Sequence, residues 1–352
     1  MRASFLPPPP EADLEQAFGA VGEASWRSLA GARVFLTGGT GFVGKWLMAT
    51  LLHADRRLAL GCELVVLSRD PEAFEATTPQ LARATGVTLA RGDVRDFEFP
   101  AGAFTHVVHA ATDVVAQNAP LETFSTCVEG TSRVLDFAAQ VGASDFLLVS
   151  SGAVYGRQPP ELDRMDESHT GAPDPLSPSS AYGEGKRVSE WLGAVRCAGS
   201  APRFKVARCF AFVGPYLPLD KHFAIGNFLR DAMAGNQITI QGDGTPYRTY
   251  LHAADMAAWL WAVLLRGKPA RAYNVGGHEA VSIGDLARRT VAALGSSARV
   301  EILKQAVPGK PAERYVPDVA RARRELALPD PLPLDEAIAR TVRWHRDSLQ
   351  ST

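Results

Sequence analysis

Short apolar runs alternate with longer amphipathic segments from Ala32 to about residue 209. Six runs are continuously apolar, which is typical of strands that are buried on both faces of a parallel sheet. These runs are RVFLT, ELVVLS, VTLA, HVVHA, DFLLVS and FKVARCF. The amphipathic segments predict helices near residues 42–54, 78–85, 121–141 and 180–198. This alternation predicts an α/β fold built on a doubly wound parallel sheet.

The pattern changes at both ends of this region. Residues 1–30 begin with four consecutive prolines and continue with loosely helical apolar spacing, which predicts a short arm packed on the main domain. From residue 210 to about 350 the pattern predicts a smaller mixed α/β domain, interleaved with returns to the sheet, that holds the substrate. Its expected elements are helices near 222–234, 253–266, 282–295 and 333–348, and short strands at ITIQG and RVEIL. Residues 31–209 form the predicted sheet domain.

Composition narrows the class of protein. The formal net charge of −1 and the short, mixed basic clusters argue against a nucleic-acid partner. The four cysteines show no CxxC or His-rich spacing, so we expect reduced thiols and no metal site. MRASFL leads directly into prolines, and no apolar run approaches ~18 residues, so we expect neither a signal peptide nor a membrane span. These features predict a cytoplasmic protein.

A glycine-rich turn follows the first predicted strand. TGGTGFVGKWL places Gly38, Gly41 and Gly44 at a three-residue spacing between a buried strand and an amphipathic helix. Glycine permits a tight turn and lets backbone N–H groups approach a pyrophosphate at the helix N-terminus. We therefore expect a dinucleotide to bind here, at Gly38, Thr40, Gly41, Phe42, Val43 and Gly44.

Two later loops extend this predicted cofactor site. GDVRD could place Asp93 at an adenine amino group, with Val94 beside it. HAAT offers the small residues Ala110, Ala111 and Thr112 where a cofactor would pass over the sheet edge.

A tyrosine and a lysine lie on one predicted helical face. SAYGEGKRVSEWL holds Tyr182 and Lys186 four residues apart, and Ser151 ends a predicted parallel strand at the edge where such sheets bind ligands. A nearby ammonium stabilises a phenolate, so we expect Lys186 to lower the pKa of Tyr182. The three residues predict a proton-transfer site.

The order of these motifs resembles the extended short-chain dehydrogenase/reductases, the NAD(P)-dependent nucleotide-sugar epimerase/dehydratase family. The resemblance covers residues 32 to about 325 through TGGTGFVG, HAAT, SSGAVYG, YGEGK, RCFAFVGP, QGDGTPYRTYLHAADMA and RAYNVGG. It implies a Rossmann domain and a catalytic triad, with Tyr182 as general acid/base, Lys186 holding the ribose and Ser151 hydrogen-bonding the reacting sugar oxygen. It also implies that Arg248 and Arg314 grip a nucleotide diphosphate, and that Ser151 and Asn227 contact the substrate.

The cofactor preference depends on the end of the second strand. Relatives that bind NAD commonly have an aspartate there, whereas this chain has Ser68 and Arg69, which suit a 2′-phosphate. NADP(H) is therefore favoured, while Asp70 keeps NAD(H) open.

The residues after Ser151 bear on the reaction. Sugar 4,6-dehydratases of this family carry an acid/base pair at the positions of Gly152 and Ala153, so their absence predicts that this chain is not a 4,6-dehydratase. We expect a nucleotide-sugar oxidoreductase. The favoured activity is that of a 4-ketoreductase, which reduces a 4-keto sugar in deoxysugar synthesis. Two alternatives stay open, a C4 epimerase and a non-catalytic dinucleotide sensor. By resemblance, a homodimer through the helices at 121–141 and 180–198 is also expected.

Overall fold

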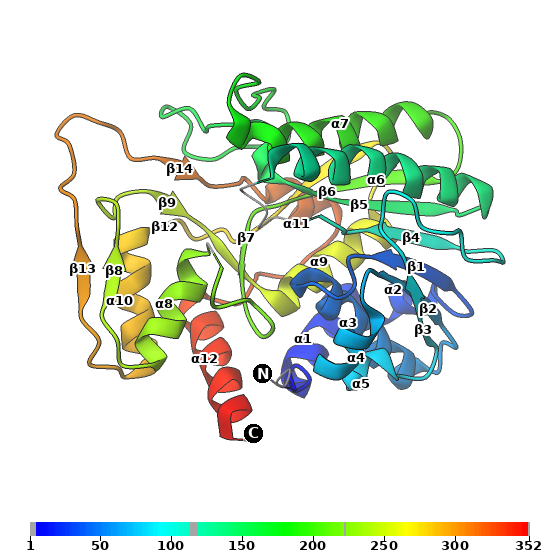
Figure 1. Ribbon diagram of the computed structural model, residues 1–352, viewed down its shortest axis with the longest axis horizontal. Coiled ribbons are helices and arrows are strands. Elements are labelled where there is room, and N and C mark those ends of the chain that lie inside the picture. The colour runs from blue at the N-terminus through cyan, green and yellow to red at the C-terminus, as the bar shows by residue number, and fades with distance from the viewer. Residues whose placement is uncertain (1–4, 113–118, 222, 351–352) are drawn as a thin grey trace.

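A seven-stranded sheet forms the centre of the molecule (Figure 1). The computed structural model describes residues 5–112, 119–221 and 223–350. All strand pairs of this sheet are parallel, in the order β11-β6-β5-β4-β1-β2-β3. The strands are β1 Arg33–Thr37, β2 Glu63–Ser68, β3 Val87–Arg91, β4 His106–His109, β5 Asp145–Ser151, β6 Arg203–Cys209 and β11 Arg271–Val275. The six predicted strands and the predicted fold class are confirmed.

The seventh strand, β11, was not predicted from the sequence. Its apolar run is interrupted by Asn274, which is fully buried. The amide of Asn274 accepts a hydrogen bond from Tyr155 and donates to the carbonyls of Met165 and Asp318. A buried polar residue is tolerated when all its partners are present, and the local sequence does not show those partners.

Helices cover both faces of the sheet (Figure 1). On one face α6 (Pro120–Gln140) packs against α7 (Ala181–Arg196), and on the other α3 (Phe42–Leu58) packs against α9 (Ala253–Arg266). The short helices α4 (Pro71–Thr77), α5 (Pro79–Ala82) and α11 (Ala320–Glu325) complete this part, with 3-10 turns at Gly152–Tyr155 and Pro178–Ser180. Within the described ranges, no helix has the length and apolar character needed to cross a membrane.

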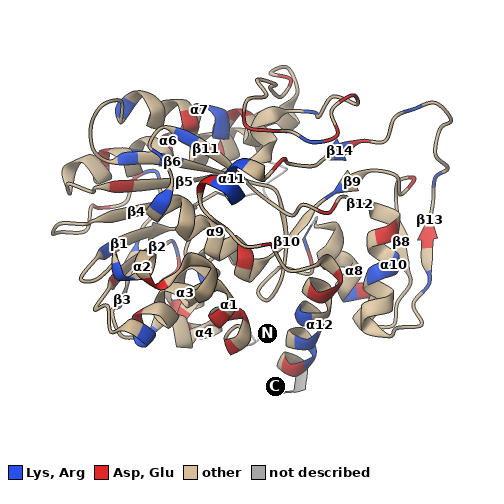
Figure 2. Cartoon of the chain, turned by 180° about the vertical axis from the view of Figure 1, so that it is seen from behind, with Lys and Arg blue, Asp and Glu red and all other residues tan. Residues whose placement is uncertain are grey.

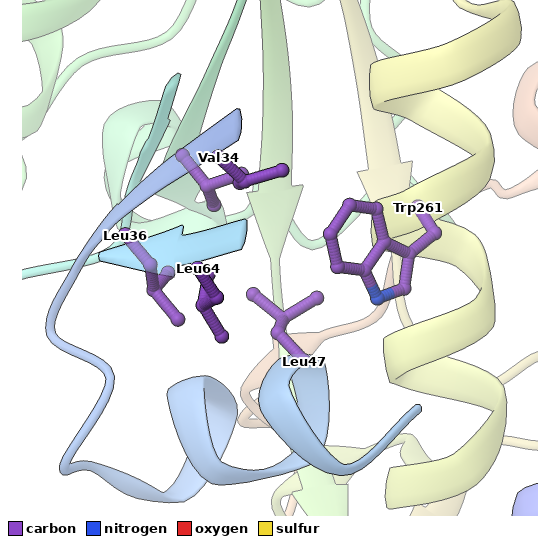
Figure 3. A pocket seen from close by; sticks show the side chains of 6 residues that line it. Val34, Leu36, Leu47, Leu64 and Trp261 are labelled. Carbon is purple, nitrogen blue, oxygen red and sulfur yellow. The ribbon is translucent and has the colours of Figure 1, made fainter. Parts of the chain in front are cut away.

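Apolar side chains of the sheet, α3 and α9 enclose a small gap in the core. Val34, Leu36 and Leu64 face Leu47 of α3 and Trp261 of α9 around a gap with no room for a water molecule (Figure 3). This gap is a packing feature of the core, because it presents no polar group to a ligand.

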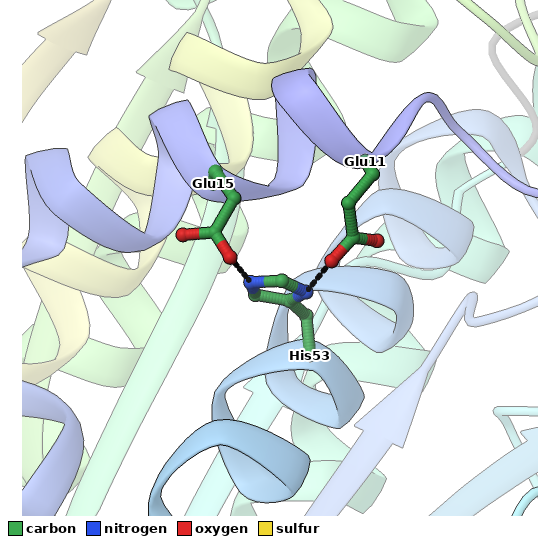
Figure 4. Close-up of side chains that lie close together, drawn as sticks. All are labelled: Glu11, Glu15 and His53. Atoms are coloured by element: carbon green, nitrogen blue, oxygen red, sulfur yellow. Dashed lines mark ion pairs between the residues drawn. The ribbon is translucent and has the colours of Figure 1, made fainter.

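The N-terminal helices α1 (Glu11–Val21) and α2 (Glu23–Arg27) pack over α9, and α1 also contacts α3. Figure 4 shows His53 of α3 between two carboxylates of α1. His53 Nδ1 lies 3.4 Å from Glu11 Oε1, and Nε2 lies 3.3 Å from Glu15 Oε1. The carboxylates approach opposite ring nitrogens, so His53 joins α1 to α3 through both of them.

A second lobe lies beside the carboxyl ends of the strands (Figure 1). Its helices α8 (Ala224–Met233), α10 (Ile283–Leu294) and α12 (Leu334–Gln350) confirm three predicted helices. Its strands are β7 Ala211–Val213, β8 Ile238–Ile240, β9 Tyr247–Arg248, β10 Tyr250–His252, β12 Val281–Ser282, β13 Val300–Ile302 and β14 Arg314–Tyr315. Acidic and basic residues are interspersed over both lobes, as Figure 2 shows from behind.

Candidate active site

The glycine turn between β1 and α3 requires two of its glycines. Gly38 has a φ of 71°. A Cβ there would lie 2.6 to 2.7 Å from the backbone of Ala110 and Ala111. A Cβ on Gly44 would lie 2.3 Å from the carbonyl oxygen of Gly38. Both distances are far below contact distance, so only glycine lets the turn pack against α3 and the end of β4.

The N-terminus of α3 fits a dinucleotide pyrophosphate. Gly41 is its N-cap residue, and no described side chain caps the helix. The N–H groups of the first turn, at Phe42 and Val43, therefore remain for an anion, which the helix dipole also favours. Gly41 is exposed and Thr40 half-buried beside it, so the predicted residues surround a reachable site.

Ser68 and Asp93 lie where the adenosine half would be expected. Ser68 is buried at the end of β2, and its Oγ accepts a hydrogen bond from the Asp70 N–H at 3.2 Å. Arg69 next to it is exposed. The carboxylate of Asp93 accepts two hydrogen bonds from the Arg95 guanidinium, at 2.8 and 3.0 Å, and Arg95 lowers the Asp93 pKa. An adenine contact by Asp93 would therefore compete with this pair.

The loop after β4 is held by one hydroxyl. Thr37 Oγ1 accepts hydrogen bonds from the N–H groups of Ala110 and Ala111, at 3.2 and 3.1 Å. Thr112 donates to the Ala111 carbonyl at 2.6 Å. Val94, from the predicted cofactor set, is buried against Gly130 of α6. These hydrogen bonds thus fix the backbone of the small residues next to the glycine turn.

Ser151 and Tyr182 meet at the carboxyl end of β5. Ser151 ends the strand, and its Oγ accepts a hydrogen bond from the Ala153 N–H at 3.1 Å. Tyr182 lies in the first turn of α7. Burial raises the Tyr182 pKa above its ordinary value, while a hydrogen bond with Ser151 lowers it.

The net shift of the Tyr182 pKa is upward, because burial is its largest cause, so the expected lowering was wrong. Lys186 is buried, and its Nζ donates to the Val149 carbonyl at 2.8 Å. Burial lowers the pKa of Lys186 itself. Because desolvation dominates at both groups, Tyr182 is held as the neutral phenol.

A chain of hydrogen bonds connects four elements behind the site. Thr37 of β1 lies 2.7 Å from His109 Nδ1, and His109 Nε2 lies 3.1 Å from Thr131 of α6. Thr131 donates to Ser189 of α7 at 2.9 Å. Burial and the Lys186 charge lower the pKa of His109 to about 3, so the imidazole is neutral. The consistent donor order assigns the proton to Nε2, since Thr37 donates to Nδ1.

Two arginines lie on paired strands of the second lobe. Arg248 of β9 is opposite Tyr315 of β14, and Arg314 is opposite Tyr247. Each guanidinium lies over the tyrosine of the other strand, 5.8 Å from the Tyr315 ring for Arg248 and 4.7 Å from the Tyr247 ring for Arg314. The Arg314 guanidinium also lies 3.7 Å from the largely exposed Asp163 carboxylate. The pair offers positive charge that suits a diphosphate.

Asn227 lies on α8, where its Oδ1 accepts a hydrogen bond from Arg230 at 3.2 Å. This bond is internal to the helix, so a substrate contact by Asn227 stays a prediction.

Sequence reasoning missed Tyr315. Its phenol interacts with Ser151, and burial raises its pKa to about 12 while Ser151 lowers it. In the AERY stretch, only Arg314 was predicted to bind the substrate. Neighbouring residues of a strand point to opposite faces, so Tyr315 and Arg314 face different surroundings.

The glycine turn and the Ser151, Tyr182 and Lys186 group define a class, the dinucleotide-dependent enzymes that move a hydride and a proton at a hydroxyl-bearing carbon. The chain belongs to the NAD dependent epimerase/dehydratase family, whose model matches residues 34–276.

Individual relatives carry several activities. The chain is 27% identical over 319 residues to UDP-glucuronic acid decarboxylase 1 of Xenopus tropicalis, covering 90% of this chain and 73% of the relative. It is 28% identical over 322 residues to dTDP-glucose 4,6-dehydratase of Streptomyces griseus, covering 89% and 93%. An epimerase structure from Methanothermobacter thermautotrophicus shares the fold, with a TM-score of 0.79, 23% identity and coverage of 95% and 97%.

These comparisons correct the exclusion of a 4,6-dehydratase, which was wrong. Relatives that decarboxylate or dehydrate a nucleotide sugar match nearly the whole chain. The exclusion assumed that proton-transferring groups must follow Ser151 in sequence. In the fold, Tyr315 brings a phenol to Ser151 from a distant strand, so Gly152 and Ala153 alone do not limit the chemistry.

Proposed function

We propose that this protein oxidises the C4 hydroxyl of a nucleotide-diphosphate sugar and returns the hydride within the same catalytic cycle. The observation that supports it is the convergence of Ser151, Tyr182 and Lys186 on the sheet edge that also carries the glycine turn. A bound nicotinamide dinucleotide would supply the hydride acceptor.

Each side chain has a role in that step. Tyr182 exchanges the proton of the C4 hydroxyl, and its raised pKa suits the return step, in which the phenol protonates the carbonyl oxygen. Ser151 hydrogen-bonds the same oxygen. Lys186 is held beneath them by the Val149 carbonyl and contributes positive charge and a ribose contact. Arg248 and Arg314 bind the diphosphate.

A UDP-linked hexuronic acid is the first substrate candidate. UDP-glucuronic acid decarboxylases are similar to this chain over 90% of its length. Oxidation at C4 turns a uronic acid into a β-keto acid, which loses carbon dioxide without needing a carboxylate base at position 152 or 153. The net reaction replaces the C6 carboxylate with a proton and leaves the cofactor oxidised again.

C4 epimerisation is the second candidate. It is supported by the fold, which resembles solved UDP-glucose and UDP-N-acetylglucosamine 4-epimerases with TM-scores of 0.73 and 0.77. An epimerase needs proton exchange only at the C4 oxygen, which Tyr182 supplies.

Product analysis tests the proposal. The protein is incubated with NAD or NADP and with UDP-glucuronic acid, UDP-glucose or dTDP-glucose, and products are identified by mass spectrometry and NMR. Loss of carbon dioxide supports decarboxylation, loss of water indicates dehydration, and an unchanged mass with inverted C4 indicates epimerisation. If none of the three sugars changes, the proposal is wrong.

A further inference from the structure

Gly152 is a glycine because another residue fills its side-chain space. A Cβ built on Gly152 would lie 2.6 Å from the Tyr315 hydroxyl and 2.7 Å from the Phe210 ring. Both distances are shorter than real Cβ contacts, so no side chain fits there without displacing Tyr315. The first position after Ser151 therefore carries a phenol from β14 in place of a side chain of its own.

The phenol is held firmly in this place. The Tyr315 ring packs against Phe210 with centroids 4.6 Å apart. The next residue, Val316, donates its N–H to Gln158 at 2.9 Å and accepts from the Met165 N–H at 2.9 Å. Backbone pairing with β9 fixes the other side of the strand. Preorganisation of this kind is what a group acting on a developing charge requires.

Ser151 thus has a phenol on each of two neighbouring elements, Tyr182 on α7 and Tyr315 on β14. A phenol is neutral near pH 7, and burial raises the Tyr315 pKa further, to about 12, so Tyr315 acts as a hydrogen-bond donor and not as a base. The Arg248 guanidinium lies 5.8 Å from its ring, on the side that the diphosphate is expected to occupy.

We propose that Tyr315 is a further catalytic residue, whose phenol donates a hydrogen bond to the substrate oxygen beside Ser151, in the place where a side chain at position 152 would otherwise act. The inference rests on the proposed function. No bond to Tyr315 forms and its proton stays on the phenol. The hydrogen bond strengthens as negative charge develops on the oxygen, whether the carbonyl is then reduced or passes through an enolate.

The test compares Tyr315→Phe with two other tyrosine variants that lose the same single atom. Tyr182→Phe removes the proposed acid/base, and Tyr273→Phe removes a phenol that bonds Lys268 and Glu325 at the far edge of the sheet. Steady-state kcat and KM are measured with the sugar that the parent turns over. UDP binding is measured by calorimetry as a readout independent of turnover.

For Tyr315→Phe we expect kcat to fall on the order of 100-fold, with KM and UDP affinity within about threefold of the parent. Tyr273→Phe should keep its kcat. The Tyr315 proposal is overturned if its kcat stays within threefold, or if only KM rises. If Tyr182→Phe keeps its kcat, the proposed function is wrong. The proposal for Tyr315 is still supported in that case if Tyr315→Phe has a strongly reduced kcat. If the parent alters none of the three sugars, both proposals fall.

Discussion

Burial shifts the pKa values of the reacting side chains. Tyr182 and Tyr315 have raised pKa values and Lys186 has a lowered one, and desolvation is the largest cause in all three. A neutral phenol in this site needs an added positive charge from the cofactor before it can lose its proton. This explains why residue identity alone led to the wrong direction for Tyr182.

Tyr182→Phe should fold and bind the cofactor within about threefold of the parent, because only one oxygen is removed. Its turnover should fall by about 10² to 10⁴, the range expected for loss of a general acid/base. Turnover and calorimetric binding of NAD check this. Turnover within threefold of the parent would show that Tyr182 does not transfer the proton.

Ser68 and Arg69 carry the prediction on cofactor preference. A charge-assisted pair between Arg69 and a 2′-phosphate favours NADP over NAD by roughly tenfold to hundredfold. Replacing Ser68 with Asp and Arg69 with Ala should reverse this preference. Calorimetry with both cofactors measures it, with Arg27→Ala as a distant surface control. A parent that binds NAD as tightly as NADP contradicts the preference.

At the scale of elements, the hydrogen-bond chain through His109 ties the cofactor side to the catalytic helix. It passes from β1 through β4 and α6 to α7. Every member is buried, so an unpaired group in the chain would be costly. These hydrogen bonds thus fix the position of the glycine turn relative to the helix that carries Tyr182.

The buried His109 in this hydrogen-bond chain makes the free energy of unfolding depend on pH. The His109 pKa is about 3 in the fold and 6.5 ordinarily, so between these values the unfolded chain binds the extra proton. Stability is therefore full above pH 6.5 and falls as pH drops toward 3, by at most about 1.4 kcal/mol per pH unit.

Denaturant unfolding across this pH range measures the slope. His109→Gln should be less stable at neutral pH but should show a shallower decline on acidification, because it has no imidazole to protonate. An unchanged slope in the variant would assign the acid sensitivity to other groups.

At the scale of the whole molecule, α6 and α7 expose large apolar side chains to solvent. Leu121 is 86% exposed, Phe124 38%, Trp191 62% and Val195 55%. Several exposed large apolar side chains on two packed helices are typical of a protein interface. We expect two copies to associate through these helices and bury the four side chains together.

Light scattering at micromolar concentration should give the mass of a dimer. Trp191→Glu should shift it toward the monomer, because the change places a charge in the apolar contact. Leu303→Glu, at a residue 51% exposed in the second lobe, is the matched control. A parent that is monomeric at this concentration contradicts the dimer.

Local pattern was enough for six of the seven strands of the central sheet and for the glycine turn. Continuous apolar runs predicted β1 to β6. Five of these strands are mostly buried by neighbours that any parallel sheet supplies, while β3 lies at the sheet edge and is only partly buried. Gly38 and Gly44 were predictable because a strand-to-helix turn needs their missing side chains. Family membership followed from the order of such motifs.

Tertiary structure decided what stands next to the reacting hydroxyl. β11 depends on partners that satisfy Asn274, and Gly152 depends on a phenol that arrives from β14. The raised pKa of Tyr182 depends on the packing around it. These properties are set by contacts between residues far apart in the chain, so neither periodicity nor spacing carries them, and the sequence alone led to the wrong exclusion of a dehydratase.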